Sequence, residues 1–195
     1  MSRVVVIQHL SLDGVMQAPG HAEEDPRDGF GHGGWGQPDN DPVMPGVLGA
    51  RMGASWSLLL GRTTYERFAD FWPRQAPNPF TDSLNRVRKY VASTTLAEPL
   101  GWANSVLLKG DAADAVAELK EQQEDTLVVF GSGVLVRSLM ARGLADELVL
   151  QIHPLVLGSG RRLFPEAGPL AAFALADSVT TATGVIIATY QKKES

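Results

Sequence analysis

Short apolar runs alternate with longer amphipathic stretches along this chain, a pattern that is typical of strands followed by helices. Residues 4–7 (VVVI) are continuously apolar, which predicts a central strand buried on both faces. Further strands are predicted at residues 57–61, 90–93, 105–109 and 126–130. Residues 174–183 and 185–192 are expected to pair as a hairpin around Gly184. This order of elements predicts an α/β fold whose sheet carries helices on both faces.

The predicted helices lie between these strands. Residues 43–54 are the weakest candidate, because three glycines lower their helix propensity. Residues 63–71 are expected to form a helix that ends at Trp72-Pro73. Thr81 is expected to cap a short helix to residue 87, and Asp111 to cap the clearest helix, to about residue 123.

The segment from residue 12 to residue 45 is rich in Gly, Pro and Asp and shows little periodicity. A loop of this length in a compact domain is usually functional or mobile. No repeat, low-complexity tract or linker divides the chain, so a single domain over residues 1–195 is predicted.

Composition narrows the classes of function. The 17 basic and 22 acidic residues give a net charge of −5, and no basic stripe exists, so nucleic acid is not an expected partner. The chain has no cysteine, which excludes disulfides and thiolate chemistry. No run reaches a membrane span, no targeting signal stands at the N-terminus, and the four histidines lack close metal-binding spacing. A cytoplasmic protein without a metal is predicted.

Three turns that follow predicted strands carry hydrogen-bond donors suited to phosphate. They are Gly131-Ser132-Gly133, Gly61-Arg62-Thr63-Thr64 and Ser93-Thr94-Thr95. Each of these turns could instead be an ordinary turn or helix cap that binds no ligand. The first turn is not a full G-x-G-x-x-G motif, because position 136 is Val. In open α/β sheets ligands bind outside the carboxyl ends of strands, so the three turns would form one crevice if their strands are neighbours.

The long irregular segment offers two further candidates. Asp13, in Ser11-Leu12-Asp13-Gly14, either orients a substrate or braces the turn. Trp35, in a Gly-rich stretch, is either a lid that stacks on substrate or a loop aromatic held in the core. Arg161-Arg162 could neutralise an anionic substrate or be solvated turn residues.

Several segments resemble the dihydrofolate reductase-like proteins related to the reductase domain of riboflavin biosynthesis. The matching segments, in order along the chain, are LSLDGV (10–15), LGRTTYERF (60–68), KYVASTTL (89–96), VFGSGVLVRSL (129–139) and DELVLQIHPLVLGSGRRLF (146–164). The resemblance covers essentially the whole chain. It implies a mostly parallel sheet with a C-terminal antiparallel hairpin and NADPH bound across the strand ends.

The resemblance also implies roles for individual residues. Arg62, Thr63 and Thr64, with the preceding Gly61, match the loop that holds the adenosine phosphate in that family, and Ser93 and Thr94 match the next phosphate-binding turn. The pyrophosphate loop corresponds to Gly131, Ser132, Gly133, Val134 and Leu135. Asp13 and Gly14 match the segment beside nicotinamide and substrate. Relatives often carry Arg at the position of Thr94, so a weaker preference for NADPH over NADH is expected here. Folate reductases keep an acid on their first helix, whereas residues 43–54 contain no Asp or Glu, so dihydrofolate itself is not an expected substrate.

The sequence therefore predicts an NADPH-dependent oxidoreductase that reduces a small pterin-, pyrimidine- or carbonyl-type substrate. NADH is the less favoured cofactor. Asp13 is the candidate catalytic and substrate-contacting residue, and Trp35 a second candidate for substrate contact. The alternative is a nucleotide-binding module without turnover. A homodimer is expected, because the apolar C-terminal strand needs cover.

Overall fold

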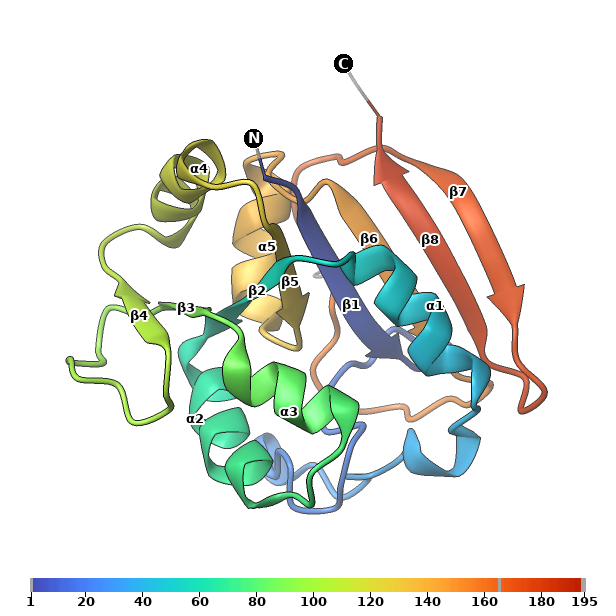
Figure 1. Cartoon of the computed structure of the whole chain (residues 1–195). Helices are drawn as coiled ribbons and strands as arrows, with labels where there is room; N and C mark the ends of the chain where they lie inside the picture. The colour runs from blue at the N-terminus through green and yellow to red at the C-terminus, as the bar shows by residue number, and fades with distance from the viewer. Residues whose placement is uncertain (1, 165, 194–195) are drawn as a thin grey trace. The chain divides into compact units, whose positions relative to one another are not determined.

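The computed structural model describes residues 2–164 and 166–193 (Figure 1). The chain forms two compact units. The first unit comprises Met1–Val5 and Met52–Ala145, and the second comprises Val6–Arg51 and Asp146–Ser195. Strand β1 (Val4–Leu10) contributes residues to both units, and the strand order is β4-β3-β2-β5-β1-β6-β8-β7. The predicted α/β class and the central position of residues 4–7 are confirmed.

Parallel strands form the sheet of the first unit. They are β2 (Trp56–Gly61), β3 (Lys89–Ala92), β4 (Ser105–Leu108) and β5 (Thr126–Phe130). β2 pairs with β3 and with β5, and β3 pairs with β4, all in parallel. Because parallel strands end at the same edge, the turns that follow β2, β3 and β5 share one edge of the unit.

Helices cover both faces of this sheet. α2 (Arg62–Phe71) and α3 (Pro79–Arg86) lie against one face, where Leu58 and Leu60 share a core with side chains of both helices. The neighbouring β3 residues Tyr90 and Val91 point to opposite faces. Val91 joins that core, whereas the Tyr90 hydroxyl lies 2.9 Å from the Gln123 side chain at the end of α4 (Ala112–Gln122). α5 (Gly133–Ala141) packs beside α4.

The start of α3 corrects one prediction. Asn78, not Thr81, is the N-cap: its Oδ1 atom accepts hydrogen bonds of 3.0 Å from the backbone N–H groups of Phe80 and Thr81. Proline is favoured at the first helical position, and Pro79 stands there directly after the cap. Thr81 is buried in the first turn of the helix. At α4 the prediction is confirmed, because the Asp111 side chain accepts from Ala113 N and Asp114 N.

The second unit holds the antiparallel strands. β6 (Glu147–Ile152) pairs with β8 (Ile186–Lys192), and β8 pairs with β7 (Phe173–Thr180). The expected hairpin around Gly184 is confirmed, and that glycine has a φ of +88°. α1 (Val43–Met52) follows two single-turn helices, η1 (Arg27–Gly29) and η2 (Gln37–Asp39).

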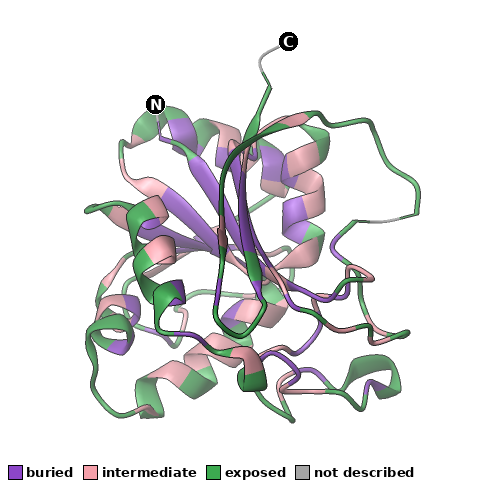
Figure 2. Cartoon of the chain, turned by 90° about the vertical axis from the view of Figure 1, so that its right-hand side faces the viewer, coloured by how far each residue is buried: buried purple, intermediate pink, exposed green. Residues whose placement is uncertain are grey.

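The buried residues are concentrated in the strands of the sheet (Figure 2). Val4, Val5 and Val6 are fully buried, as their continuous apolar run predicts. The irregular segment of the second unit has a small core of its own, made of Val15, Ala18, Phe30 and Trp35. Over the described part of the chain, every helix is too short or too polar to cross a membrane.

Candidate functional site

Two of the predicted phosphate turns are hydrogen-bonded to each other within the first unit. The Ser132 hydroxyl accepts from Gly61 N at 3.0 Å, and Ser132 N donates to the Thr64 hydroxyl at 2.9 Å. Gly131 and Ser132 both have left-handed backbones, with φ of +56° and +54°. A Cβ on Gly131 would lie 3.2 Å from Thr64 Oγ1 and Cγ2, so the turn favours glycine there. The sequence thus positions the ends of β2 and β5 together.

In the part of the chain that the structure describes, the N-terminus of α5 presents open backbone donors. The bond from Val136 N to Ser132 O begins the helix ladder, so the N–H groups of Gly133, Val134 and Leu135 precede it. The Ser132 side chain does not cap them. Val134 is 69% exposed, which leaves this helix end accessible. Unsatisfied N–H groups together with the positive end of the helix dipole favour an anion.

The third turn begins where β3 ends. The Ser93 hydroxyl accepts from the backbone N–H groups of Thr95 and Leu96, each at 3.1 Å, and lies 3.4 Å from the Thr95 hydroxyl. Ser93 therefore shapes the turn, while Thr94 and Thr95 are exposed. The turn lines a pocket of about 550 Å³, a volume suited to a small ligand. The pocket is lined by Arg62, Ala92, Ser93, Thr94, Thr95, Gly110, Asp111 and Ala112.

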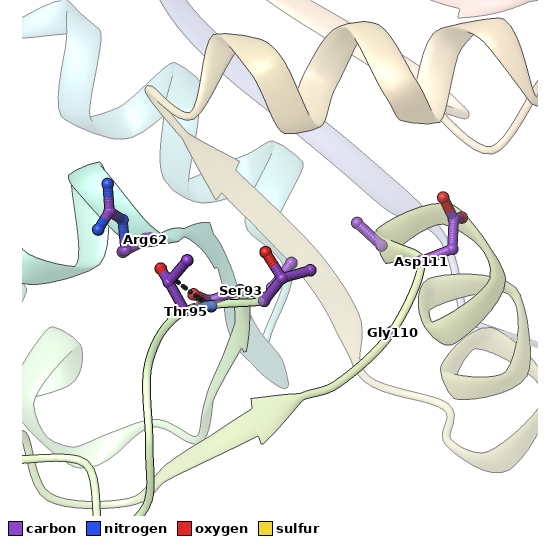
Figure 3. A pocket seen from close by; sticks show the side chains of 8 residues that line it. Arg62, Ser93, Thr95, Gly110 and Asp111 are labelled. Carbon is purple, nitrogen blue, oxygen red and sulfur yellow. Dashed lines mark hydrogen bonds between the residues drawn. The ribbon is translucent and has the colours of Figure 1, made fainter.

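Arg62 supplies the positive charge of this pocket. It is the first residue of α2 and is exposed. Within residues 2–164 and 166–193 its guanidinium has no hydrogen-bond or ion-pair partner. Figure 3 shows Arg62 on one side of Ser93 and Thr95, and Asp111 on the other. A free guanidinium next to exposed hydroxyls is a suitable environment for a phosphate group.

The pocket also contains residues that sequence reasoning did not assign to a site. Gly110 and Asp111 follow β4, and Asp111 was expected to act as a helix cap alone. The available signal was a fourth strand-to-helix junction, Lys109-Gly110-Asp111, of the same kind as the other three. The parallel pairing of β3 with β4 brings that junction beside Ser93.

The other predicted site residues lie in the second unit. Asp13 braces a turn there: its Oδ1 atom accepts from the Ser11 hydroxyl at 2.7 Å and from Leu157 N at 3.1 Å, and its Oδ2 atom accepts from Gly158 N at 3.0 Å. The bond from Ser11, and then the bond from Leu157, lower the pKa of Asp13 to about 2. These contacts support the bracing alternative, and substrate contact by Asp13 stays a prediction. Gly14, with φ of +79°, belongs to the same turn.

Trp35 belongs to the core of the second unit. It is 8% exposed, and its indole N–H donates to the Gln17 carbonyl at 2.6 Å. These contacts support the core alternative, so stacking of Trp35 on a substrate stays a prediction. The two arginines of the Gly-rich loop are also engaged: Arg161 pairs with Asp28 at 2.8 Å, and Arg162 lies 3.4 Å from Asp13.

A buried polar chain beside Trp35 was not anticipated. His153 is fully buried and lies between Asp39, 3.0 Å from its Nδ1 atom, and His9, 2.9 Å from its Nε2 atom. The second ring nitrogen of His9 lies 3.2 Å from the Gln151 amide nitrogen. Burial, and secondarily His153, lowers the pKa of His9 to about 3. Among the described residues no group of histidines and carboxylates is arranged to hold a metal ion.

This architecture defines the class of the protein: its fold is that of dihydrofolate reductase. Dihydrofolate reductase from Enterococcus faecalis, solved in complex with NADP(H) and RAB-propyl, matches with a TM-score of 0.58 at 14% identity, covering 98% of this chain and 97% of that one. A putative riboflavin biosynthesis protein from Shewanella sp. PV-4 matches with a TM-score of 0.70 at 23% identity, covering 98% and 99%. A pyrimidine reductase-like protein from Corynebacterium diphtheriae gives 0.68 at 13% identity, covering 100% and 93%.

The chain belongs to the RibD C-terminal domain family, whose model matches residues 3–187. It is also 26% identical over 139 residues to the uncharacterized protein YyaP of Bacillus subtilis (strain 168), across 69% of this chain and 72% of that protein. The family and fold implied by the sequence motifs are confirmed.

Proposed function

We propose that this protein is an NADPH-dependent reductase of a small pterin-, pyrimidine- or carbonyl-type substrate. The observation that carries the proposal is the free Arg62 guanidinium beside the exposed hydroxyls of Thr94 and Thr95 in one pocket. The family and its reductase-type relatives support the same class of reaction.

The first unit has two sites that fit two parts of this cofactor. The pocket at Arg62 would hold the phosphate on the adenosine ribose. The open N–H groups of residues 133–135 would hold the pyrophosphate. The bonds of Ser132 to Gly61 and Thr64 fix these two strand ends beside each other, as a ligand with phosphates at both positions requires. Gly131 keeps its turn free of a side chain where the backbone would approach the pyrophosphate.

A reductase of this kind does not need a strong acid or base among its own side chains, because the cofactor carries the hydride chemistry. When bound, NADPH would supply the reducing equivalents, and the protein would bind and orient it and limit the access of water. α1 contains no Asp or Glu, so a pterin substrate would not meet the helix acid that folate reductases use. We therefore propose a substrate other than dihydrofolate.

The proposal is tested by measuring nucleotide binding to wild type and Arg62→Ala. NADPH at 100 times its Kd should add about 2.7 kcal/mol to the free energy of unfolding, measured as a rise in melting temperature. Arg62→Ala should weaken NADPH binding by about 1.5–3 kcal/mol and hardly change NADH binding. Arg74→Ala is the control, because Arg74 is an exposed arginine of the same unit that pairs with Asp70 outside the pocket.

Two outcomes would contradict parts of the proposal. If neither NADPH nor NADH at millimolar concentration stabilises the protein, the nucleotide site is wrong. If NADPH binds but is not oxidised with any of a set of carbonyl, pterin and pyrimidine compounds, the protein is a nucleotide-binding module and not a reductase.

A further inference from the structure

The pocket that holds Arg62 also holds a carboxylate with one unused oxygen. Asp111 is exposed, and its Oδ1 atom accepts both cap bonds, from Ala113 N at 2.9 Å and from Asp114 N at 3.0 Å. In the described residues no donor reaches its Oδ2 atom. No ion pair joins Asp111 to Arg62 in the same part of the chain. Over the described part of the chain, the pocket therefore presents an unpaired guanidinium and a carboxylate with one unbonded oxygen (Figure 3).

We propose that Asp111 is a specificity-determining residue that lowers the preference of this pocket for NADPH over NADH. The inference rests on the proposed function, since it concerns the same nucleotide site. A phosphate on the adenosine ribose would be attracted by Arg62 and repelled by Asp111. A ribose hydroxyl, in contrast, would donate a hydrogen bond to the free carboxylate oxygen, as acidic residues do in NAD sites.

The N-termini of α4 and α5 differ in a way that supports this assignment. At α5 the cap residue Ser132 leaves the first backbone donors open. At α4 the donors of Ala113 and Asp114 are bonded to Asp111, whose charge also offsets the positive end of that helix. The α5 end thus favours an anion, and the α4 end favours a neutral group that can donate a hydrogen bond.

Capping the helix and selecting the cofactor are separable roles of Asp111. Asparagine caps a helix about as well as aspartate, so Asp111→Asn should keep both backbone bonds while it removes the charge. Asp114→Asn is the matched control. It makes the same change of charge in the first turn of the same helix, but its carboxylate pairs with Arg142 and does not line the pocket.

The experiment measures the Kd of NADPH and of NADH for wild type and both variants, by calorimetry at constant ionic strength. Asp111→Asn should tighten NADPH binding by about fivefold, as expected for removing one like charge near the phosphate. NADH binding should stay equal or weaken, so the ratio of the two affinities should rise. Adenosine 2′,5′-bisphosphate and AMP, used as fragments, should show the same change in ratio. Asp114→Asn should leave the ratio at its wild-type value.

Three results would overturn the inference. If the affinity ratio is the same in Asp111→Asn as in wild type, Asp111 is a helix cap alone. An equal rise in both variants would show a long-range charge effect and no specific contact. If Asp111→Asn has a lower melting temperature, Asp111→Ser, a second uncharged cap, must reproduce the rise in ratio, or the inference fails. Lack of binding of either nucleotide by wild type would instead refute the proposed function itself.

Discussion

Lys89 is the most informative place to perturb the stability of the first unit. Its side chain is fully buried, and its ammonium donates to three carbonyls: Asn85 O at 2.9 Å, Val87 O at 2.9 Å and Ala103 O at 3.0 Å. The three N–H bonds of the ammonium match three acceptors. The ammonium also lies 4.4 Å from the centroid of the Trp102 ring. One side chain therefore joins the end of α3 to the segment before β4.

The effect of Lys89→Met follows from two opposing terms. The change leaves three carbonyls without this donor, at roughly 2 kcal/mol each. It also removes the cost of burying a charge. Burial lowers the pKa of Lys89 from 10.5 to about 8. At neutral pH this shift corresponds to a cost of about 3 kcal/mol for keeping the buried ammonium charged, and the substitution removes that cost. The free energy of unfolding at pH 7 should therefore fall by about 3 kcal/mol.

The lowered pKa of Lys89 also determines how the difference in free energy of unfolding between wild type and Lys89→Met depends on pH. Between pH 8 and pH 10.5 the unfolded chain binds a proton at Lys89 that the folded chain has released, so the stability of wild type should rise with pH relative to Lys89→Met. Urea denaturation at pH 7 and pH 9.5 measures both effects. Lys109→Met is the control, because Lys109 is an exposed lysine whose replacement should cost under about 0.5 kcal/mol. A loss below about 1 kcal/mol for Lys89→Met, or a difference that does not grow with pH, would refute the reasoning.

Three further predictions concern the second unit. The pKa of His9 is lowered from 6.5 to about 3, so as the pH falls the unfolded chain takes up a proton at His9 before the folded chain does. The free energy of unfolding should therefore fall by up to about 5 kcal/mol as the pH is lowered from 6.5 to 3. Urea titrations should show a shallower fall in His9→Gln; equal slopes would contradict the prediction. Asp13→Asn should lower the free energy of unfolding by about 1–2 kcal/mol, because one amide oxygen cannot replace the two bonded carboxylate oxygens. Unchanged stability with reduced turnover would instead indicate contact with substrate. Light scattering at micromolar concentration should give a homodimer, and Leu175→Lys, on the exposed edge strand β7, should give a monomer; a monomeric wild type would exclude this pairing.

Much of the fold could be predicted because its strands are short, continuous apolar runs. Residues 127–130 are continuously apolar, so burial on both faces is the stable outcome, and they lie in the strand Thr126–Phe130 of the structure. Helix starts were harder, since several residues near a terminus can act as a cap. At α3 both Asn78 and Thr81 are suitable cap residues, and the helix begins at Pro79, which directly follows Asn78.

The site was only partly predictable, because a sequence does not show which donors remain open after folding. Asp111 could be read as a helix cap from its position, but its place in the pocket depends on the pairing of β3 with β4. The role of Trp35 likewise depends on contacts with distant residues such as Gln17. His9 and His153 are 144 positions apart, so no local spacing could have joined them.

In the three turns after β2, β3 and β5, several serine and threonine hydroxyls have a structural role. Hydroxyls of the second and third turns were expected to donate to a phosphate, yet Thr64 and Ser93, like Ser132, use their hydroxyl oxygens to accept backbone hydrogen bonds. Those residues shape and join the strand ends. Within the described residues, the groups that remain open are the Arg62 side chain, the backbone N–H groups of residues 133–135 and the exposed hydroxyls of the third turn. We therefore expect a phosphate bound at this edge to contact the guanidinium, the exposed hydroxyls beside it or the helix end, while the hydroxyls that accept backbone bonds hold the turns in place.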